Sequence, residues 1–443
     1  MAQPRSRILL DQLVQSIRDG RLKPGDQLPP VRQLMKQHGL ALATAAKVYR
    51  ELENLGLVVG ETGRGTFVRD QTVPRVSWVD QQRATEIVDL TFNYPSLPGQ
   101  DELLREGLRG VAAVGDLDAL MHSQPHGGRL HERETVARHL LSRGVQVSGA
   151  QVFLLNGAQH GLSITMGALF KPGDVIAVDA LTYPGLLNLA RHYSLEVVAI
   201  PVGDHGTDLD VLAEVCRQRK VKAVYTMPTL HNPLGVVMPA HQREALAQLA
   251  RRFDLILLED GAYAFLAEPA PPPLWHFAPE RTVYVSALSK SVASGLRFGF
   301  LAVPPQWTAI MEHTISVTTW STSSIVSALA CRWLDMGVVE AWEHKKREDA
   351  RQRQALAAQV FSGLDIQTHP ASYFVWIRLP EEVRADVLAA DLARQGVLVS
   401  TAAPFCAHGN PQHALRVALG SLDMNSLAQA LASVRHAIDW YPV

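Results

Sequence analysis

The sequence predicts two units: an N-terminal winged helix-turn-helix and a larger α/β domain with a large parallel-sheet lobe and a smaller α+β lobe. Two patterns predict this division. Helical periodicity followed by a glycine-rich hairpin fills the first 70 residues, and short Val/Ile/Leu runs then alternate with helical segments. A length of 443 residues, with 47% hydrophobic and 19% charged residues, is ordinary for a globular chain that buries a sizeable core.

The first 70 residues contain three helices and a hairpin. Apolar residues at helical spacing predict the helices, and each helix ends at a glycine suited to a helix C-terminus: Gly20, Gly39 and Gly56. Two short strands, over residues 57–60 and 66–68, then flank a glycine-rich tip at residues 61–65. Three helices followed by a hairpin predict a winged helix-turn-helix.

A linker is expected between the two units. The residues from Arg69 to about Thr85 are polar and follow neither the helical nor the strand period. We therefore assign residues 1–70 to the winged helix-turn-helix, 71–86 to the linker and 87–443 to the second domain.

The second domain begins with apolar runs separated by helical segments. Six of these runs are expected to be strands: residues 152–155, 175–178, 197–200, 223–226, 255–258 and 282–285. This alternation is typical of a largely parallel sheet covered by helices. From about Ser327 the chain is more helical, and alternating segments at residues 373–377 and 415–419 predict the smaller α+β lobe.

Charge and cysteine content exclude several classes of protein. The formal net charge is −1, yet residues 1–70 hold 11 Lys and Arg against 7 Asp and Glu, and this local surplus indicates a nucleic-acid partner. Cys216, Cys331 and Cys406 are too scattered for a disulfide framework or a zinc cluster, and they fit reduced thiols in a cytoplasmic protein. The apolar run at residues 8–10 is too short for a signal peptide, and no stretch approaches membrane-spanning length. We expect a soluble, non-exported protein with no membrane contact.

Polar residues after the predicted strands indicate a ligand site, because ligands of open α/β sheets bind at the carboxyl ends of the strands. Gly157 opens a helix whose free N–H groups suit a phosphate. Asn232 stands in a rigid Asn-Pro turn, Asp260 ends an apolar strand, and Lys290 follows another strand. Taken alone, each would be an ordinary turn residue or surface charge, and Tyr183 would be a buried structural tyrosine.

In this order and spacing, these residues resemble those of the fold type I pyridoxal-phosphate enzymes, the aspartate aminotransferase family, over the whole second domain. The resemblance implies that Lys290 forms the Schiff base with the aldehyde of pyridoxal 5'-phosphate. It implies that Asp260 keeps the pyridine nitrogen protonated, so that the ring acts as an electron sink. Asn232 and Tyr263 would hydrogen-bond the phenolate oxygen, and Tyr183 would stack on the ring.

The same resemblance implies where anionic groups bind. Arg297 and the amides of Ala158 and Gln159 would hold the cofactor phosphate. Arg416, in the last alternating segment, matches the family's arginine for the carboxylate of an amino acid. Taken alone, Arg416 would be an exposed strand residue.

Two segments depart from the family. Ala287 stands where the family commonly has a Ser or Thr that contacts the phosphate, so one hydrogen bond is lost. Residues 121–130 contain no tyrosine where the family supplies one from the neighbouring subunit, so that contact is altered. His122, His126 and His131 fit no single helix face and have no evident carboxylate partner, so we expect no metal site.

The first unit resembles the DNA-binding domain of the GntR family. Residues 23–32 and 63–68 match its proline-containing segment and its wing. The resemblance implies that the third helix enters the major groove. Ala41 and Leu42 replace a Ser-Arg pair that this family often has there, so the family's base specificity does not transfer.

Four residues of this unit are expected at the DNA. Thr44 and Lys47 would lie on the exposed side of the recognition helix, and Arg32 would contact the DNA backbone. Arg64, at the wing tip, would reach phosphates or the minor groove. Without the motif, Arg32, Lys47 and Arg64 would be solvated charges.

The combination of these two resemblances is similar to the MocR subfamily of GntR regulators. It implies a homodimer, with head-to-tail exchange of DNA-binding domains, in which an amino-acid, amine or vitamer effector at the lysine-bound cofactor alters operator binding on double-stranded DNA. A catalytically active aminotransferase with a vestigial DNA-binding domain is the main alternative. A DNA-binding protein whose second domain only dimerises is a weaker one.

Overall fold

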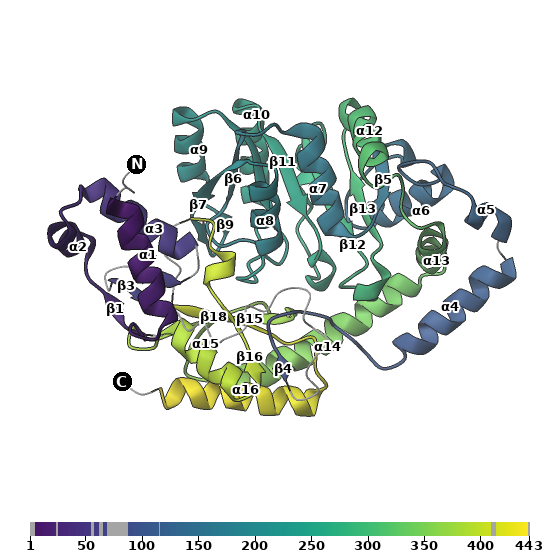
Figure 1. Ribbon diagram of the computed structural model, residues 1–443. Coiled ribbons are helices and arrows are strands. Elements are labelled where there is room, and N and C mark those ends of the chain that lie inside the picture. The colour runs from purple at the N-terminus through teal and green to yellow at the C-terminus, as the bar shows by residue number, and fades with distance from the viewer. Residues whose placement is uncertain are drawn as a thin grey trace.

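The structure is a computed structural model that describes residues 5–23, 25–54, 57–61, 65–68, 87–114, 116–408 and 413–441 (Figure 1). The predicted linker at residues 71–86 and the wing-tip Arg64 lie outside the described residues. No helix in the described ranges is long and apolar enough to cross a membrane.

The N-terminal helices and hairpin form as the sequence predicts. The helices are α1 (Arg5–Arg18), α2 (Val31–His38) and α3 (Leu42–Asn54), and the strands are β1 (Gln27–Leu28), β2 (Val58–Glu61) and β3 (Gly65–Val68). Leu28, Leu34, Val48 and Leu52 are buried together between them. The short strand β1, which the sequence pattern did not reveal, pairs antiparallel with β3 and gives the sheet order β1-β3-β2.

Seven described strands form the central sheet of the large lobe. In spatial order they are β5 (Val152–Leu155), β13 (Gly299–Ala302), β12 (Thr282–Ala287), β11 (Ile256–Asp260), β10 (Val221–Thr226), β6 (Val175–Asp179) and β7 (Glu196–Ile200). All six predicted strands are confirmed. β13 was not predicted, and it is the one that runs antiparallel to both its neighbours.

Helices cover both faces of this sheet (Figure 1). Ile176 and Val178 of β6 pack with Met166 in one apolar cluster, whereas Ala177 between them packs with Leu246 in another. The helices of this lobe are α4 (Gln100–Val114), α5 (Leu117–Met121), α6 (Leu130–Leu141), α7 (Ala158–Leu169), α8 (Pro184–His192), α9 (Leu209–Gln218), α10 (Ala240–Arg252), α11 (Leu274–Phe277), α12 (Thr308–Thr318) and α13 (Ser324–Asp335). A small hairpin, β8 (Val202–Gly203) with β9 (Gly206–Thr207), joins β7 to α9.

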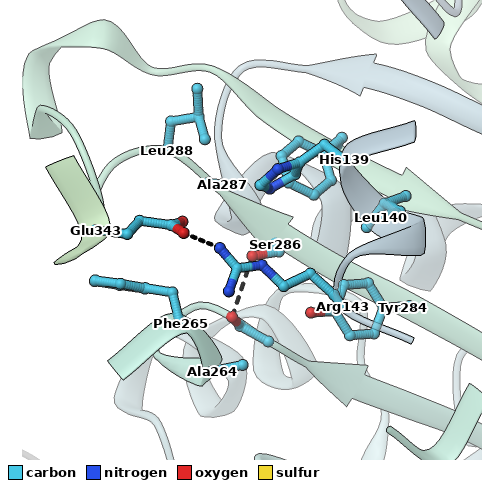
Figure 2. A pocket seen from close by; sticks show the side chains of 12 residues that line it. His139, Leu140, Arg143, Ala264, Phe265, Tyr284, Ser286, Ala287, Leu288 and Glu343 are labelled. Carbon is cyan, nitrogen blue, oxygen red and sulfur yellow. Dashed lines mark hydrogen bonds and ion pairs between the residues drawn. The ribbon is translucent and has the colours of Figure 1, made fainter. Parts of the chain in front are cut away.

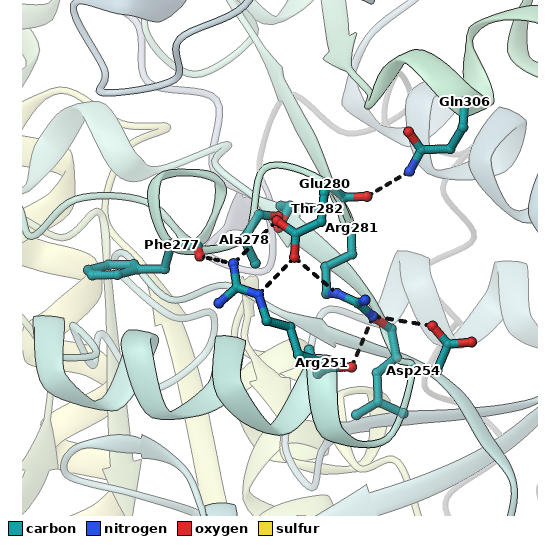
Figure 3. A network of polar contacts seen from close by, with 10 residues as sticks. Arg251, Asp254, Phe277, Ala278, Glu280, Arg281, Thr282 and Gln306 are labelled. Atoms are coloured by element: carbon teal, nitrogen blue, oxygen red, sulfur yellow. Dashed lines mark hydrogen bonds and ion pairs between the residues drawn. The ribbon is translucent and has the colours of Figure 1, made fainter.

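A polar network lies at the amino end of β12 (Figure 3). Arg251 Nε donates to Glu280 Oε1 at 2.9 Å, and Arg281 Nη1 donates to Asp254 Oδ1 at 3.4 Å. These bonds tie α10 to the turns that enter β11 and β12. They lie opposite the carboxyl ends of the strands, which remain available for a ligand site.

The small lobe is an antiparallel sheet in the order β14-β15-β18-β17, and helices pack on it. Its elements are β14 (Asp365–Gln367), β15 (Phe374–Arg378), β17 (Ser400–Thr401), β18 (Ala414–Ala418), α15 (Ala385–Arg394) and α16 (Met424–Asp439), with the long helix α14 (Val338–Val360) leading into it. The predicted segments at 373–377 and 415–419 correspond to β15 and β18, which pair directly.

The start of the second domain also belongs to the small lobe. Strand β4 (Val88–Asp89) pairs in parallel with β16 (Val397–Leu398), and the Ala418 amide donates to the Leu90 carbonyl at 2.8 Å. The sequence placed the small lobe only after Ser327, because two residues of strand give no periodic signal. The chain therefore enters the second domain through the small lobe.

The small lobe also contacts the N-terminal unit. The guanidinium carbon of Arg384 lies 3.9 Å from the centre of the Phe67 ring on β3, and Arg384 Nη1 donates to the Gly25 carbonyl at 3.3 Å. A cation over an aromatic face, with one hydrogen bond beside it, fixes the N-terminal unit against the end of the lobe where α15 begins.

Candidate functional site

Asp260 ends β11 in a fully buried position. Its carboxylate accepts hydrogen bonds from the Tyr225 hydroxyl and from the Ala262 amide, both at 2.9 Å. Burial raises the pKa of Asp260, and these two donors oppose that rise because they stabilise the charged form. The carboxylate is therefore held in one orientation at the carboxyl end of the sheet.

Lys290 follows β12 and lies beside two tyrosines. Its Nζ donates to the Asn93 carbonyl at 2.5 Å and lies 5.5 Å from the ring centre of Tyr94 and 5.8 Å from that of Tyr263. The Asn93 amide in turn donates to the Tyr263 hydroxyl at 3.5 Å. Lys290 and Tyr263, predicted from different strand ends, therefore share one site.

Asn232 and its neighbour His231 occupy the turn after β10. Asn232 is 4% exposed, and its Oδ1 has no hydrogen-bond partner among the described residues. His231 Nε2 lies 3.3 Å from Asp179 Oδ2, and Asp179 also accepts from Thr226 at 2.9 Å. The Asn232 amide oxygen is thus a buried polar atom that remains available to a ligand.

Tyr183 precedes α8, and its ring lies against Gly185. A Cβ on Gly185 would be 2.4 Å from the Tyr183 ring atoms, so only glycine permits this position. Burial raises the pKa of the Tyr183 phenol, and the negative charge of Asp260 raises it further. Tyr183 thus stays a neutral aromatic ring close to Asp260.

The start of α7 and Arg297 form the anion-binding end of the site. Gly157 precedes the helix at φ 90°, and a Cβ there would lie 2.6 Å from Arg297 Nη2. Arg297 Nη2 donates to the Asn156 carbonyl at 3.2 Å. The first N–H groups of a helix, here those of Ala158 and Gln159, have no partner within the helix. A guanidinium next to such groups suits a phosphate.

Arg416 of β18 is buried rather than exposed as a lone strand residue would be. It is 5% exposed, and its guanidinium carbon lies 5.5 Å from the Phe374 ring centre and 5.6 Å from that of Phe405. Its Nη1 donates to the Thr91 carbonyl at 2.6 Å, while its Nε has no hydrogen-bond partner among the described residues. Burial lowers the pKa of Arg416, and a negatively charged partner would stabilise its charged form.

Ala287, which stands where the aminotransferase family commonly has a Ser or Thr, is the last residue of β12. It lies opposite Gly299 of β13, beside the Gly157 turn. Its methyl group offers no hydrogen bond at a position where a hydroxyl would face the anion-binding end.

Several site residues escaped sequence analysis. Asn93 and Tyr94 follow the predicted linker, and Tyr225 and Lys346 read as core residues of a strand and a helix. Lys346 of α14 is fully buried and donates to the Pro95 carbonyl. Burial lowers the pKa of Lys346 to about 8. The sequence holds no periodic signal for contacts between segments that are not adjacent in the chain.

A small cavity of about 10 Å³, lined in part by Ala287, is not the ligand site (Figure 2). The ion pair between half-buried Arg143 and buried Glu343 lines it, together with His139. This volume suits one water molecule.

The predicted DNA-contacting residues that are described lie on α2 and α3. Arg32 and Lys47 are exposed, whereas Thr44 is half-buried. Lys47 Nζ lies 4.0 Å from Glu51 one turn later on the same helix. Arg64 lies outside the described residues.

An apolar surface surrounds the segment that lacks the family's tyrosine. Met121 is 83% exposed and Trp320 is 58% exposed, and Leu117 and Val317 are exposed as well. His126 meets Trp320 edge to face, with ring centres 4.7 Å apart. Helices α4, α5 and α13 lie together on this side of the large lobe (Figure 1).

Comparison with known families agrees with this architecture. The family described as aminotransferase class I and II matches residues 85–434, and the family described as bacterial regulatory proteins, gntR family, matches residues 6–68. The donor set fits pyridoxal phosphate, because the Asn232 oxygen and the Arg416 Nε are buried without partners among the described residues, and the start of α7 offers N–H groups that the helix itself leaves unpaired.

Two similar proteins align with nearly the whole chain. The chain is 27% identical to the uncharacterized HTH-type transcriptional regulator YdeF of Bacillus subtilis, over 98% of this chain and 95% of that protein. It is 26% identical to the uncharacterized HTH-type transcriptional regulator YjiR of Escherichia coli, over 96% and 97%. The solved kynurenine aminotransferase of Pyrococcus horikoshii shares the fold, with a TM-score of 0.75 at 24% identity over 80% of this chain and 91% of that one.

The aminotransferase class I and II match indicates pyridoxal 5'-phosphate as the cofactor, and the gntR match supports a regulatory role for the N-terminal domain. The chain belongs to the class I and II aminotransferase family, and it carries a gntR-type domain at residues 6–68.

Proposed function

We propose that this protein is a transcriptional regulator in which an amino compound or vitamer, bound at the lysine-linked cofactor, changes the affinity for an operator. The observation that supports this most is that the lysine, the carboxylate and the carboxylate-binding arginine of a pyridoxal-phosphate site meet in a chain that begins with a winged helix. Residues 1–70 would bind DNA, residues 71–86 would connect the two domains, and residues 87–443 would bind the cofactor and sense the amino compound.

Each site residue receives one role. Lys290 attaches the cofactor, and Asp260, held by Tyr225, pairs with its ring nitrogen. Asn232 and Tyr263 hydrogen-bond the phenolate oxygen. When bound, the cofactor supplies an aldehyde for amines and an electron-withdrawing ring.

The remaining residues hold the rest of the cofactor and its ligand. Tyr183 covers one face of the ring, and Arg297 with the Ala158 and Gln159 amides holds the phosphate. Arg416 receives the carboxylate of the effector, supported by Phe374 and Phe405 on either side.

DNA recognition belongs to α3 and its surroundings. Thr44 and Lys47 would face base edges in the major groove, and Arg32 would fix the phosphate backbone. Arg64 would extend this contact from the wing tip. Two such domains in a homodimer, exchanged head to tail, would read two half-sites.

A second candidate is an active aminotransferase with a vestigial DNA-binding domain. The buried Asp260, Lys290 beside Tyr263 and the oriented Arg416 favour it, because the family uses the same groups for catalysis. The alanine at position 287 and the loop without tyrosine favour sensing instead, because they hold the cofactor less firmly during proton transfer at the substrate carbon.

Footprinting tests the proposal. The full-length protein, loaded with pyridoxal phosphate, is mapped on DNA upstream of its own and neighbouring genes, with and without a panel of amino acids and amines. A protected site whose occupancy changes with one of these compounds supports the regulator. Absence of protection even at low salt, together with multiple turnovers on an amino-acid and keto-acid pair at about 1 per second or faster, would establish the aminotransferase instead.

A further inference from the structure

Three cationic side chains of the site hold one short segment of backbone. We name residues 90–95, which directly follow β4, the strap. Arg416 donates to the Thr91 carbonyl at 2.6 Å, Lys290 donates to the Asn93 carbonyl at 2.5 Å, and Lys346 donates to the Pro95 carbonyl. The three acceptors are the carbonyls of every second residue, Thr91, Asn93 and Pro95, so the cations hold the segment along its length.

The strap is anchored to the small lobe at both ends. The Leu90 amide donates to the Leu398 carbonyl at 2.8 Å, and the Ala418 amide donates to the Leu90 carbonyl. Ser421 Oγ donates to the Phe92 carbonyl at 2.6 Å and accepts from the Tyr94 amide at 3.0 Å. Arg416 and Lys290 lie between these anchors, at the positions where a ligand is bound.

Arg416 holds the strap through a replaceable bond. Its Nη1 donates a hydrogen bond to a neutral carbonyl oxygen, and its Nε has no partner among the described residues. The side chain is buried, with its guanidinium near the rings of Phe374 and Phe405. A carboxylate accepts two parallel hydrogen bonds from guanidinium and forms stronger ones than a neutral amide oxygen does. An arriving carboxylate therefore competes directly with the Thr91 carbonyl.

We propose that the carboxylate of an amino-acid effector, on reaching Arg416, displaces the Thr91 carbonyl and so releases the strap. This inference rests on the proposed function and adds the first structural response to the ligand. An amine without a carboxylate would react at the cofactor yet leave the Arg416 bond intact. Because the strap begins four residues after the segment assigned as the linker, its release loosens the point at which the DNA-binding domain is tethered.

Two compounds that differ by one group separate these steps. The full-length protein loaded with pyridoxal phosphate is mixed with L-phenylalanine or with 2-phenylethylamine, which lacks only the carboxylate. The visible absorbance of the cofactor reports reaction of the amine, and hydrogen–deuterium exchange with mass spectrometry reports protection of the amides in residues 87–98. L-alanine and ethylamine provide a second pair with a smaller side chain.

The expected result is that both members of a pair shift the absorbance, while only the amino acid accelerates strap exchange. The acceleration is on the order of tenfold, since a hydrogen bond from a charged donor is worth at least that factor in an equilibrium. Equal exchange with the amino acid and the amine, when both shift the absorbance, overturns the inference and leaves the sensing function intact. No absorbance shift with any of the compounds overturns the sensing function itself.

Variants test the same bond without ligand. Arg416→Gln is expected to raise strap exchange to the level of the amino-acid complex and to abolish any further response. Ser421→Ala, which removes a different strap anchor, is expected to raise the basal exchange but to keep the response. Arg378→Gln, on the neighbouring strand β15, pairs with exposed Asp365 and is the matched control. Strap exchange that is unchanged in Arg416→Gln, in a protein with normal cofactor content, contradicts the inference.

Discussion

The Tyr225 hydroxyl donates to Asp260 Oδ2 at 2.9 Å, and both side chains are buried. Replacing Tyr225 by Phe removes one of the two donors that oppose the burial-driven rise in the pKa of Asp260. The carboxylate then pairs less well with a protonated ring nitrogen. We expect Tyr225→Phe to bind pyridoxal phosphate about tenfold more weakly and to change the pH dependence of the cofactor absorbance.

The control for this variant is Tyr284→Phe. Tyr284 is also buried, on the nearby strand β12. If both variants lose affinity equally, the effect is one of core packing, and the role assigned to Tyr225 is wrong.

Lys290→Ala should lose covalent cofactor, because the lysine is the one covalent attachment that we assign. Borohydride reduction of the loaded protein followed by peptide mass spectrometry should place the adduct on Lys290. Asp260→Asn should keep most of the cofactor but lose the response to amines, since the phosphate contacts and the lysine remain. An adduct on Lys346, the buried lysine nearby, would refute the assignment.

DNA binding should reside in residues 1–70 and weaken with salt. Each phosphate that a cation neutralises contributes about 0.9 to the slope of log affinity against log salt. Arg32→Ala should lower that slope by about this amount and reduce affinity for all sequences alike. Titrations by fluorescence anisotropy at several salt concentrations measure both, with Arg7→Ala of α1 as the control. A slope that does not change in Arg32→Ala would remove Arg32 from the interface.

Acid should destabilise the protein through His139. Burial and the charge of Arg143 lower the pKa of His139 from 6.5 to about 3. Between these values the unfolded chain binds a proton that the folded chain does not, so stability is lost as the pH falls from 6.5 towards 3. At pH 5 the loss is about 2 kcal/mol.

His139→Gln removes this contribution. Its unfolding free energy in urea should therefore fall less between pH 7 and pH 5 than that of the unmodified protein. His122→Gln, at a histidine whose side chain is 72% exposed, is the control and should behave like the unmodified protein. Parallel pH profiles for all three proteins would contradict the prediction.

Met121→Glu should convert the proposed homodimer into monomers. Met121 is 83% exposed, and Leu117 and Trp320 are exposed as well. Exposed apolar area of this kind is typical of a surface that another protein covers. A charge there would be buried in a dimer without a partner. Light scattering after size-exclusion chromatography gives the mass. Trp440→Glu, at an exposed apolar residue on the small lobe, should leave the mass unchanged.

The elements of the fold were predictable wherever burial leaves a local pattern. β5 and β6 are buried on both faces, so each appears in the sequence as an apolar run, at residues 152–155 and 175–178. β13 was missed because the four residues Gly299–Ala302 follow a glycine-rich segment and show no alternation. β4 and β16 were missed because two residues of strand carry no period.

The site was predictable where its residues follow strands. Asp260 and Lys290 stand at the ends of apolar runs, and such positions converge in a parallel sheet whatever the connections are. Asn93 follows no predicted strand, and Tyr225 lies inside one rather than after it. Their contacts with Tyr263 and Asp260 depend on the register of β10 against β11 and on the path of the chain after β4, which the sequence does not express locally.

The placement of Arg416 has a consequence for protein synthesis. The winged helix is complete by Val68, whereas β18 is made some 350 residues later. β18 pairs with β15, and its Ala418 amide donates to the Leu90 carbonyl of the strap. Domains form in the order in which the ribosome delivers them. A message cut short before β18 would therefore yield a chain that has its DNA-binding domain but lacks Arg416 and its strand. Under the proposed function, such a fragment would bind operators without responding to a ligand, so control would depend on complete translation of the last 30 residues.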